Sequence, residues 1–543
     1  MTPGRSRCSS RVGLSIRQGG CQGSPALHAK IRAVSGLVIE AGVSFLLFFT
    51  PFAFGGVEGW ALGVLQIVAG VVTAAWALGR LSQRGAIPIA GGRAGLNIRI
   101  PIILFILLVC LQLVPLPAGL IRSLSPATDS LYAMTLPGYA EGRRFQPGDL
   151  VPWLLEDLRA ELPAAESGEA LEFPKPSFPA NGLVPHAPAR RTVSIYPYDT
   201  RTQLTVFLSY AGIFAAVLGY YTTRERLLRL LLIGSVSAAA VSLLGIAQKL
   251  TWNGKLYWIR EGNYLNIFGP FVDRNTYAGF AEVWMAVAAA MALSAARRVR
   301  EKGTAHLPQL FLWGAASVLL AGGISFSLSR AGILCAGLAI GLLAVLLLYY
   351  GRAALETGLL GVIVLSTAAF LFYIGPEKVF ERVGTLSEGS RVPTLQLRVR
   401  AWEREASLIQ QNPVLGTGLG TFRFAFTRYA PPGQSWQNVA DNEYLELLCD
   451  TGLAGGILFL WGAGTWLWRV ARPARMRGRP ERHLYIGMVA GLAALLVHSA
   501  ISSNLHVPAN GLLIPVLGAA LLNLMALTSR RAAAESGSPR ATV

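Results

Sequence analysis

Charged residues are scarce in this sequence. Only 14% of the 543 residues are Asp, Glu, Lys or Arg, whereas 53% are hydrophobic. A soluble protein of this length is expected to be more polar, because about a quarter of the residues in ordinary globular domains are charged. The shortage of charge therefore excludes an ordinary soluble protein.

Cysteine is also rare. The chain has five cysteines, and no two of them are spaced as in a disulfide framework or a metal-binding motif. They are Cys8, Cys21, Cys110, Cys335 and Cys449. The sequence therefore gives no reason to expect a bound metal ion, and we expect no cofactor.

Long apolar runs, by contrast, recur along the whole chain. Segments near 20 residues are long enough to cross about 30 Å of hydrocarbon as helices. We therefore predict an all-α polytopic membrane protein with about 12 transmembrane helices. The predicted spans lie near residues 34–54, 58–79, 100–120, 202–221, 227–248, 276–296, 309–327, 331–350, 357–375, 447–468, 484–503 and 509–529.

The basic residues indicate which ends of these helices face the cytoplasm. Lys and Arg outnumber Asp and Glu by 48 to 29, and most of them lie in the N-terminal tail, in alternate short loops and in the C-terminal tail. Membrane proteins carry such an excess in their cytoplasmic loops, so we expect both termini in the cytoplasm and the other loops outside it. A nucleic-acid-binding surface is not expected, because the basic residues are spread over loops between apolar spans.

Two of the outward loops are long. The first, residues 121–201, is rich in Pro, Ala and acidic residues, which predicts a loosely folded insertion with one amphipathic helix near 150–163. The second, residues 376–446, contains TLQLRVRAWEREASLIQQ, a predicted helix that ends at Asn412-Pro413. Long loops with structure of their own are usually functional. The predicted order is a basic tail (1–33), three spans (34–120), the insertion (121–201), six spans (202–375), the functional loop (376–446), three spans (447–529) and a tail (530–543).

Three arginines are predicted on the outward side: Arg274, Arg330 and Arg398. The guanidinium group stays protonated and presents a planar fork of donors, which suits a phosphate or diphosphate group. The alternative for each is an interfacial arginine that snorkels or forms a salt bridge. Arg330 is the strongest candidate, because its short turn, SLSRAG, joins two almost wholly apolar spans.

The segment ADNEYLELLCD supplies the candidate general bases. Asp441 and Glu443 could each accept a proton from a hydroxyl group. In the alternative interpretation Asp441 caps a helix that begins at Glu443, and Asn442 is another cap candidate. Glu446 and Asp450 follow on the same helix, where they are expected to orient the loop or pair with an arginine.

Two other features are weaker signals. His498 and His506, in VHSAISSNLHVPAN, could each be a second base or a hydrogen-bond partner, or simply interfacial polar residues at a helix end. GTGLG at 416–420 resembles part of a dinucleotide fingerprint, but nothing before it resembles a strand. We expect a tight turn there that packs closely against its neighbours.

Taken in order, several stretches resemble the O-antigen ligase and polymerase superfamily, membrane glycosyltransferases of the GT-C kind. They are GPFVDRNTYAGF, SLSRAG, RVRAW with NPVLGTGLGTF, ADNEYLELLCDTGLAGG and HSAISSNLHVPAN. The resemblance implies an enzyme of the bacterial inner membrane whose active site faces the periplasm. Such an enzyme takes a glycan from undecaprenyl diphosphate and passes it to a hydroxyl of lipid A-core, a growing glycan or a protein. The implied reaction is inverting and independent of metal ions.

The resemblance also implies roles for particular residues. Arg330 matches the family's arginine in an SR-containing hairpin, and Arg398 matches the arginine four residues before a loop tryptophan. Arg274 and Asn275 match an N/D-R-N motif. These residues, with Asn442, are expected to bind the substrate, and the arginines are expected to offset charge on the leaving diphosphate.

The sequence departs from the family pattern at two places. Many relatives have a histidine just before the asparagine that matches Asn442, whereas this chain has Asp441. Ser502 and Ser503 replace an acidic–aromatic pair. We therefore rank Asp441 first as the catalytic base, Glu443 second and His498 third.

Three alternatives to a ligase follow from the same residues. A polysaccharide polymerase uses the same donor and differs in its acceptor, which the sequence does not reveal. A transporter would place ionisable residues near the middle of its spans, and only Glu40 and Glu282 approach that description here. A non-catalytic assembly partner of a polysaccharide machine is the third alternative, because the family histidine is missing.

Overall fold

The computed structural model describes residues 25–82, 92–135, 139, 190–261, 266–350, 393–429, 440–471 and 476–535, together with positions 358, 361, 364 and 365. Several predicted segments lie outside the described residues. They are most of the 121–201 insertion, including its helix near 150–163, nearly all of the span at 357–375, and the two ends of the chain.

Almost all regular structure in the described residues is helical. The long helices are α1 (Pro25–Phe52), α2 (Gly59–Leu81), α3 (Gly92–Leu113), α7 (Pro197–Tyr220), α8 (Arg224–Leu250), α9 (Arg274–Lys302), α10 (Leu307–Ser327), α11 (Arg330–Tyr350), α14 (Pro393–Gln411), α16 (Glu443–Val470), α17 (Arg482–His498) and α19 (Leu513–Glu535). The short ones are α4 (Ala118–Leu124), α5 (Pro126–Thr135), α15 (Phe422–Ala425) and α18 (Pro508–Gly511), with 3₁₀ turns at Phe54–Gly56, Thr304–His306 and Phe426–Arg428. A two-stranded antiparallel sheet pairs β1 (Leu116–Pro117) with β2 (Arg190–Arg191).

Among the described residues, nine helices are long and apolar enough to cross a membrane. Two shorter apolar helices, Ile98–Leu113 and Arg482–His498, fall at the predicted spans 100–120 and 484–503. The prediction of an all-α polytopic membrane protein is confirmed. The third predicted span, 100–120, extends past the end of α3 at Leu113. The helix ends there because Pro115 and Pro117 follow it, and proline cannot continue a helix.

Helix α9 forms the centre of the bundle. Its 18-residue apolar window is completely buried, and α8, α10, α11 and α17 pack around it. Small side chains permit this packing, as is usual between membrane helices. A Cβ atom on Gly234 of α8 would lie 1.9 Å from the ring of Trp284, and one on Gly491 of α17 would lie 2.7 Å from the carbonyl oxygen of Val283. Helix α9 is therefore held in a densely packed core, in which it is buried from Thr276 to Ala296.

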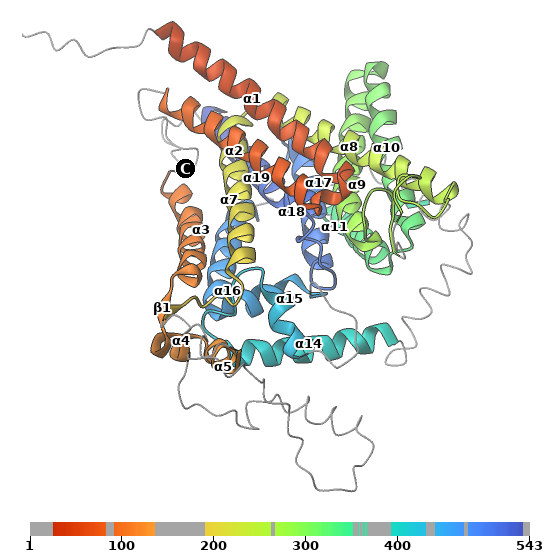
Figure 1. The fold of residues 1–543 in the computed structure, drawn as a ribbon. Helices are drawn as coiled ribbons and strands as arrows, with labels where there is room; N and C mark the ends of the chain where they lie inside the picture. Colours follow the sequence, from red (N-terminus) through yellow and green to blue (C-terminus); the bar gives the residue numbers. More distant parts are fainter. Residues whose placement is uncertain are drawn as a thin grey trace, which may run out of the picture.

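The predicted outward segments gather at one end of the molecule. In Figure 1, α4, α5, α14 and α15 lie together at the lower end, where α4 and α5 lie below the upright helix α3 and α14 runs crosswise to the right, below α15. Helix α14 confirms the predicted helix in the functional loop. It ends at Gln411, and the side-chain oxygen of Asn412 then accepts a hydrogen bond from Ser125 at 2.8 Å.

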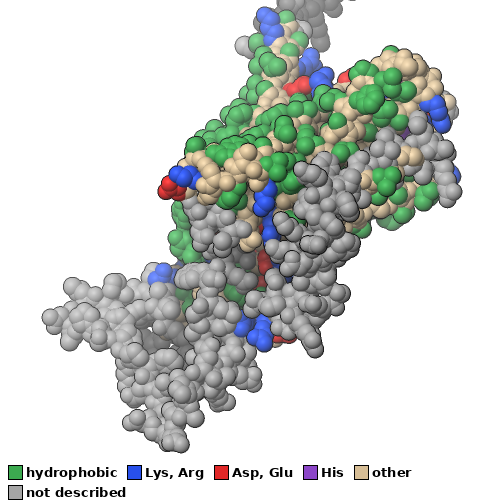
Figure 2. Space-filling model, turned by 90° about the vertical axis from the view of Figure 1, so that its right-hand side faces the viewer, with side chains coloured by type: hydrophobic (Ala, Val, Ile, Leu, Met, Phe, Trp, Pro, Cys, Tyr) green, Lys and Arg blue, Asp and Glu red, His purple; other side chains and the backbone are tan. Residues whose placement is uncertain are grey.

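The surface of the bundle is strongly apolar. Figure 2 shows hydrophobic side chains spread over the upper part of one face, with few charged side chains between them. Leu37, Ile67, Phe311 and Trp468 are each at least 69% exposed. Exposed apolar area of this kind marks a lipid-facing surface in a chain with membrane-spanning helices.

A kink divides α16 into two parts. Gly452 has φ 62° and ψ −167° inside this helix, a backbone conformation that glycine adopts far more readily than other residues. The predicted tight turn GTGLG packs against the kink, and its three glycines all have positive φ. The backbone N–H of Gly418 donates to the carbonyl of Asp450 at 3.0 Å. The prediction of a close-packed turn is confirmed.

Candidate active site

The first turn of α9 holds Arg274 and Asn275. Asp273 caps this helix, because its Oδ1 accepts a hydrogen bond from the backbone N–H of Asn275 at 2.5 Å. The backbone N–H of Arg274 donates to the carbonyl of Asn266 at 2.6 Å, which fixes the preceding loop. Both Arg274 and Asn275 are half-buried. A capped helix terminus on a packed core therefore positions the predicted N/D-R-N motif.

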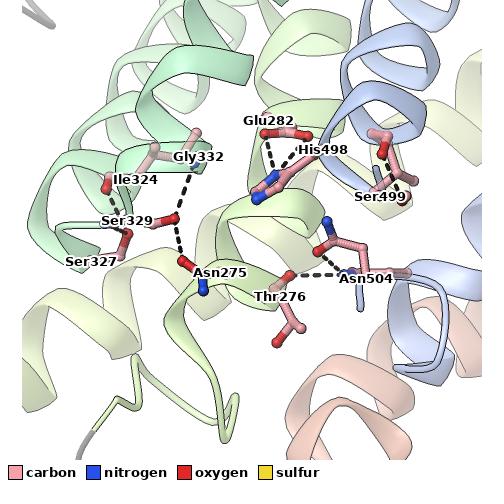
Figure 3. A network of polar contacts seen from close by, with 12 residues as sticks. Asn275, Thr276, Glu282, Ile324, Ser327, Ser329, Gly332, His498, Ser499 and Asn504 are labelled. Carbon is pink, nitrogen blue, oxygen red and sulfur yellow. Dashed lines mark hydrogen bonds and ion pairs between the residues drawn. The ribbon is translucent and has the colours of Figure 1, made fainter. Parts of the chain in front are cut away.

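A hydrogen bond joins the first turn of α9 to the first turn of α11 (Figure 3). The hydroxyl of Ser329 donates to the side-chain oxygen of Asn275 at 2.7 Å and accepts from the backbone N–H of Gly332 at 3.0 Å. Helix α11 begins at Arg330, directly after Ser329. Arg274 and Arg330 thus begin neighbouring helices, and the predicted substrate residue Asn275 links them.

Arg398 and Asp441 form an ion pair. The Nε atom of Arg398 lies 3.2 Å from Oδ2 of Asp441, and the two side chains are 24% and 36% exposed. Arg398 comes from α14, and Asp441 lies two residues before α16. The structure therefore brings together two predicted site residues that are far apart in sequence, and it leaves both accessible to a ligand.

Asn442, not Asp441, caps α16. The side-chain oxygen of Asn442 accepts from the backbone N–H groups of Tyr444 at 3.0 Å and Leu445 at 3.2 Å. The interpretation of Asp441 as the cap is wrong, since Asn442 takes the position from which a side chain reaches those donors. The Asp441 carboxylate is directed to Arg398 instead. Asn442 was predicted to bind substrate, and the contact that the structure shows for its side chain is this cap.

Asp273 interacts electrostatically with Arg274 on α9 and with the Arg398–Asp441 ion pair. Burial raises the pKa of Asp273 above its ordinary value, against the lowering effects of the hydrogen bond from Asn275 and of the Arg274 guanidinium. The Asp441 carboxylate raises the pKa further, and the Arg398 guanidinium lowers it. Asp273, Arg274, Arg398 and Asp441 therefore lie close enough to act on one another electrostatically.

A second group of charges involves Glu443, Glu446 and His506. Nδ1 of His506 lies 2.8 Å from Glu443, and its Nε2 lies 2.9 Å from Glu446. Glu443 also accepts from the backbone N–H groups of Leu505 and His506, and Glu446 accepts from Ala440. Glu446 thus holds the loop at Ala440, and its ion-pair partner is His506, not an arginine.

His506 is a cation within this group. Burial alone would lower the pKa of His506, but the carboxylates of Glu443 and Glu446 raise it well above its ordinary value. The ring is therefore protonated at neutral pH, where it can donate a hydrogen bond but cannot accept a proton. Glu443, the second-ranked base, has both oxygens engaged in this group.

Asp450 has a structural partner as well. Its Oδ2 accepts from the backbone N–H of Gly420, in the glycine-rich turn, at 2.5 Å. This hydrogen bond fixes the turn against the kinked helix α16. The expected pairing of Asp450 with an arginine is not the contact that the described residues show.

Glu405 on α14 was missed by the sequence analysis. Its side chain is completely buried, and neither carboxylate oxygen has a hydrogen-bond partner among the described residues. Burial raises the pKa of Glu405 to about 8, and the neighbouring carboxylates of Glu446 and Asp441 add to the shift. Glu405 is therefore a neutral acid close to both groups of charges. The amphipathic pattern of α14 was the available signal, but it does not distinguish a buried Glu from an exposed one.

His498 lies apart from these groups. Its ring is fully buried, and Nδ1 lies 3.3 and 3.2 Å from the two carboxylate oxygens of Glu282 on α9 (Figure 3). The next residue, Ser499, does reach the site, because its carbonyl accepts from the backbone N–H of Glu443 at 3.0 Å. His498 therefore supports the site from inside the bundle.

A cavity of about 360 Å³ opens between α3, α7 and α16. Most of its wall is apolar, with Phe105, Phe207 and Phe459 among the lining residues. Glu443, Glu446, Asp450 and His506 also line it. The cavity thus combines an apolar wall with the second group of charges.

The arrangement suits transfer chemistry at a phosphate ester. It places the Arg398 guanidinium, which can bind an anion, beside the Asp441 carboxylate, which could receive a proton. The neutral acid of Glu405 and the imidazolium of His506 lie close by. Donors of fixed position are what a developing anionic leaving group requires.

Part of the chain is similar to a known protein family. Residues 315–460 match the family model described as O-antigen ligase, and no curated protein matches the chain. The match includes Arg330, Arg398 and Asp441, but it covers less than half of the chain. The resemblance inferred from the motifs is confirmed over this region, where residues 315–460 are similar to the O-antigen ligase family.

Proposed function

We propose that this protein is an O-antigen ligase-like glycosyltransferase of the bacterial inner membrane. It transfers a glycan from undecaprenyl diphosphate to an acceptor hydroxyl, with its active site on the periplasmic side. The observation that carries the proposal is the Arg398–Asp441 ion pair beside the capped turn that bears Arg274. The O-antigen ligase match across the same residues supports it.

The arginines bind the diphosphate in this proposal. Arg274 and Arg330 begin two helices that are joined through Asn275 and Ser329, so a ligand held by both meets a rigid frame. Arg398 approaches from α14. As the glycosidic bond to the phosphate breaks, negative charge grows on the leaving group, and guanidinium groups stabilise it through charge-assisted hydrogen bonds.

Asp441 receives the proton of the acceptor hydroxyl. The oxygen of that hydroxyl attacks the anomeric carbon, the diphosphate leaves with its electron pair, and the proton passes to the carboxylate. The Arg398 guanidinium, 3.2 Å away, orients this carboxylate before the reaction. Attack from the face opposite the leaving group gives the inverted product, and no step calls on a metal ion.

In this proposal the cavity binds the lipid chain and the sugar of the donor. Its apolar wall between α3, α7 and α16 suits a hydrocarbon chain. Glu443 and Glu446 suit hydroxyl groups, because carboxylates accept hydrogen bonds from them and repel phosphate.

A reconstituted assay tests the proposal. The full chain in proteoliposomes receives an undecaprenyl diphosphate-linked glycan and a lipid A-core acceptor, and product is measured over time. We expect Asp441→Asn and Arg398→Ala each to lower turnover by about a hundredfold or more. The matched control is Arg423→Ala, because Arg423 forms an ion pair with Asp199 outside the site. It should stay within about twofold of the wild type.

The result that would overturn the proposal is normal turnover in the Asp441→Asn and Arg398→Ala double variant. A polymerase is the alternative function, and the choice of acceptor separates it from a ligase. If the protein extends a lipid-linked glycan and ignores lipid A-core, the polymerase assignment holds. A transporter would move the labelled donor across the vesicle membrane without forming product.

A further inference from the structure

Three potential metal ligands meet inside the bundle, away from the residues of the proposed reaction. They are Glu282 of α9, Cys335 of α11 and His498 of α17. One ligand atom from each lies within 4.8 Å of the other two. Glu282 and His498 are 0% exposed and Cys335 is 3% exposed. Figure 3 shows Glu282 and His498 facing each other between their helices.

The geometry of the pair is unusual for a simple buried ion pair. The Nδ1 atom of His498 lies almost equally far, 3.3 and 3.2 Å, from the two oxygens of Glu282. Charge-assisted N–H···O hydrogen bonds are usually about 2.7–2.9 Å long. The other ring nitrogen, Nε2, is buried and has no hydrogen-bond partner among the described residues. The separation of Nδ1 from the Glu282 oxygens is thus longer than a charge-assisted hydrogen bond.

We propose that Glu282, Cys335 and His498 bind a Zn²⁺ ion. Thiolate, imidazole and carboxylate are the three ligand types that zinc takes in proteins. With zinc bonds of about 2.0–2.1 Å to nitrogen and oxygen, two ligand atoms of a tetrahedral site lie about 3.3 Å apart. The distances from Nδ1 of His498 to the Glu282 oxygens, 3.3 and 3.2 Å, are close to this value. The Cys335 side chain completes a third corner, and water can occupy the fourth.

The charge balance favours this ion in an apolar interior. Zn²⁺ with one carboxylate, one thiolate and a neutral imidazole has no net charge, so the site avoids the cost of an isolated buried charge. Zinc binds the thiolate and carboxylate forms of such ligands, so binding releases protons.

The ion would hold three functional helices together. Glu282 lies about two turns along α9 from Arg274, and Cys335 lies just over one turn along α11 from Arg330. His498 precedes Ser499, whose carbonyl accepts from Glu443. The metal thus fixes the distance between the two arginine-bearing turns. This consequence rests on the proposed function, whereas the metal site itself does not.

Metal binding is measured directly on the purified full chain. The protein is prepared with a tag that contains no histidine, stripped with a chelator and reconstituted with Zn²⁺ or Co²⁺ in detergent. We expect one zinc per chain by elemental analysis. Co²⁺ should give a thiolate-to-metal charge-transfer band in the near ultraviolet, which reports a cysteine ligand independently of any activity.

Single substitutions test each ligand. Cys335→Ser should abolish the charge-transfer band, and Glu282→Gln and His498→Gln should each weaken zinc binding by at least about tenfold. Cys110→Ser is the matched control, since Cys110 is an exposed cysteine of α3, and it should retain both signals. Elution as a single monodisperse species shows that each variant is folded.

Two results would overturn the proposal. One is a wild-type chain that binds less than a stoichiometric amount of zinc after reconstitution. The other is a Cys335→Ser variant with an undiminished cobalt band, which would place the metal elsewhere. Neither result bears on glycosyl transfer, so failure of the metal site and failure of the proposed function remain distinguishable.

Discussion

Two histidines eight residues apart meet glutamates in opposite surroundings. His498 faces Glu282 with no exposed surface on either side chain, whereas His506 lies between Glu443 and Glu446 with 29% of its side chain exposed. The first pair depends entirely on its partners for solvation, while the second group is fixed by backbone N–H donors and reached by solvent. The same residue types therefore serve the interior of the bundle in one place and the candidate site in the other.

The largest effect is expected from breaking the buried pair. Glu282→Ala removes one partner of a fully desolvated pair and should destabilise the chain by about 3–5 kcal/mol. Unfolding by SDS titration, with a chelator present, measures the change. Glu301→Ala is the control, because Glu301 forms an exposed pair with Arg297 on the same helix, and it should cost less than about 1 kcal/mol. Equal losses of stability in the two variants would contradict the expectation that the buried pair contributes more than the exposed one.

The second effect concerns the buried acid on α14. The folded chain holds the Glu405 proton up to about pH 8, whereas the unfolded chain releases it near 4.5. Stability should therefore fall as the pH rises through this interval, by on the order of 1 kcal/mol per pH unit. Glu405→Gln cannot ionise, so its stability should change less over the same range. The exposed Glu403→Gln should keep the wild-type slope, and a wild-type profile for Glu405→Gln would contradict the buried neutral acid.

The half-buried His506 group should give a smaller effect in the same direction, a loss of stability as the pH rises. Because the pKa of His506 is raised, its stabilising contribution is fully present below its ordinary value of 6.5 and is lost as the pH rises through the folded value. His506→Gln should destabilise the chain by about 1–2 kcal/mol at pH 6 and by less at high pH. Unfolding at a series of pH values measures this difference, with His306→Gln as a control. A loss independent of pH would mean that His506 acts through packing alone.

The smallest effect on stability belongs to the Arg398–Asp441 pair. Both side chains are partly exposed, so Arg398→Ala should cost about 0–1 kcal/mol while it lowers turnover greatly. The two measurements on the same preparation separate a functional pair from a structural one. If Arg398→Ala unfolded the chain as much as Glu282→Ala does, its loss of activity would carry no functional meaning.

Much of the fold was predictable because the apolar runs are long. The lengths of the apolar runs were sufficient to predict the positions of the membrane helices. The end of α14 was predicted from Asn412-Pro413. The end of α3 was misplaced, although Pro115 and Pro117 were visible, because hydropathy continues past them. Local periodicity therefore predicts where a helix lies better than where it stops.

The candidate site was predictable only in its separate pieces. Each arginine and carboxylate stood out by type and position, but the pairing of Arg398 with Asp441 depends on how α14 lies across the bundle. Asp441 and Asn442 are equally good caps in sequence, and only backbone geometry selects Asn442. Glu282, Cys335 and His498 come from three distant helices, so no spacing reveals them.

Beyond the kink at Gly452, only a short helical segment of α16 is available to cross the membrane. From Leu453 to Val470 the helix extends about 27 Å, slightly less than a typical hydrocarbon core of about 30 Å. In a bilayer of longer acyl chains, the acidic first turns of α16 are drawn towards hydrocarbon unless the lipid thins around them. The thickness of the surrounding lipid is therefore expected to set the height of the α16 carboxylates relative to the membrane surface.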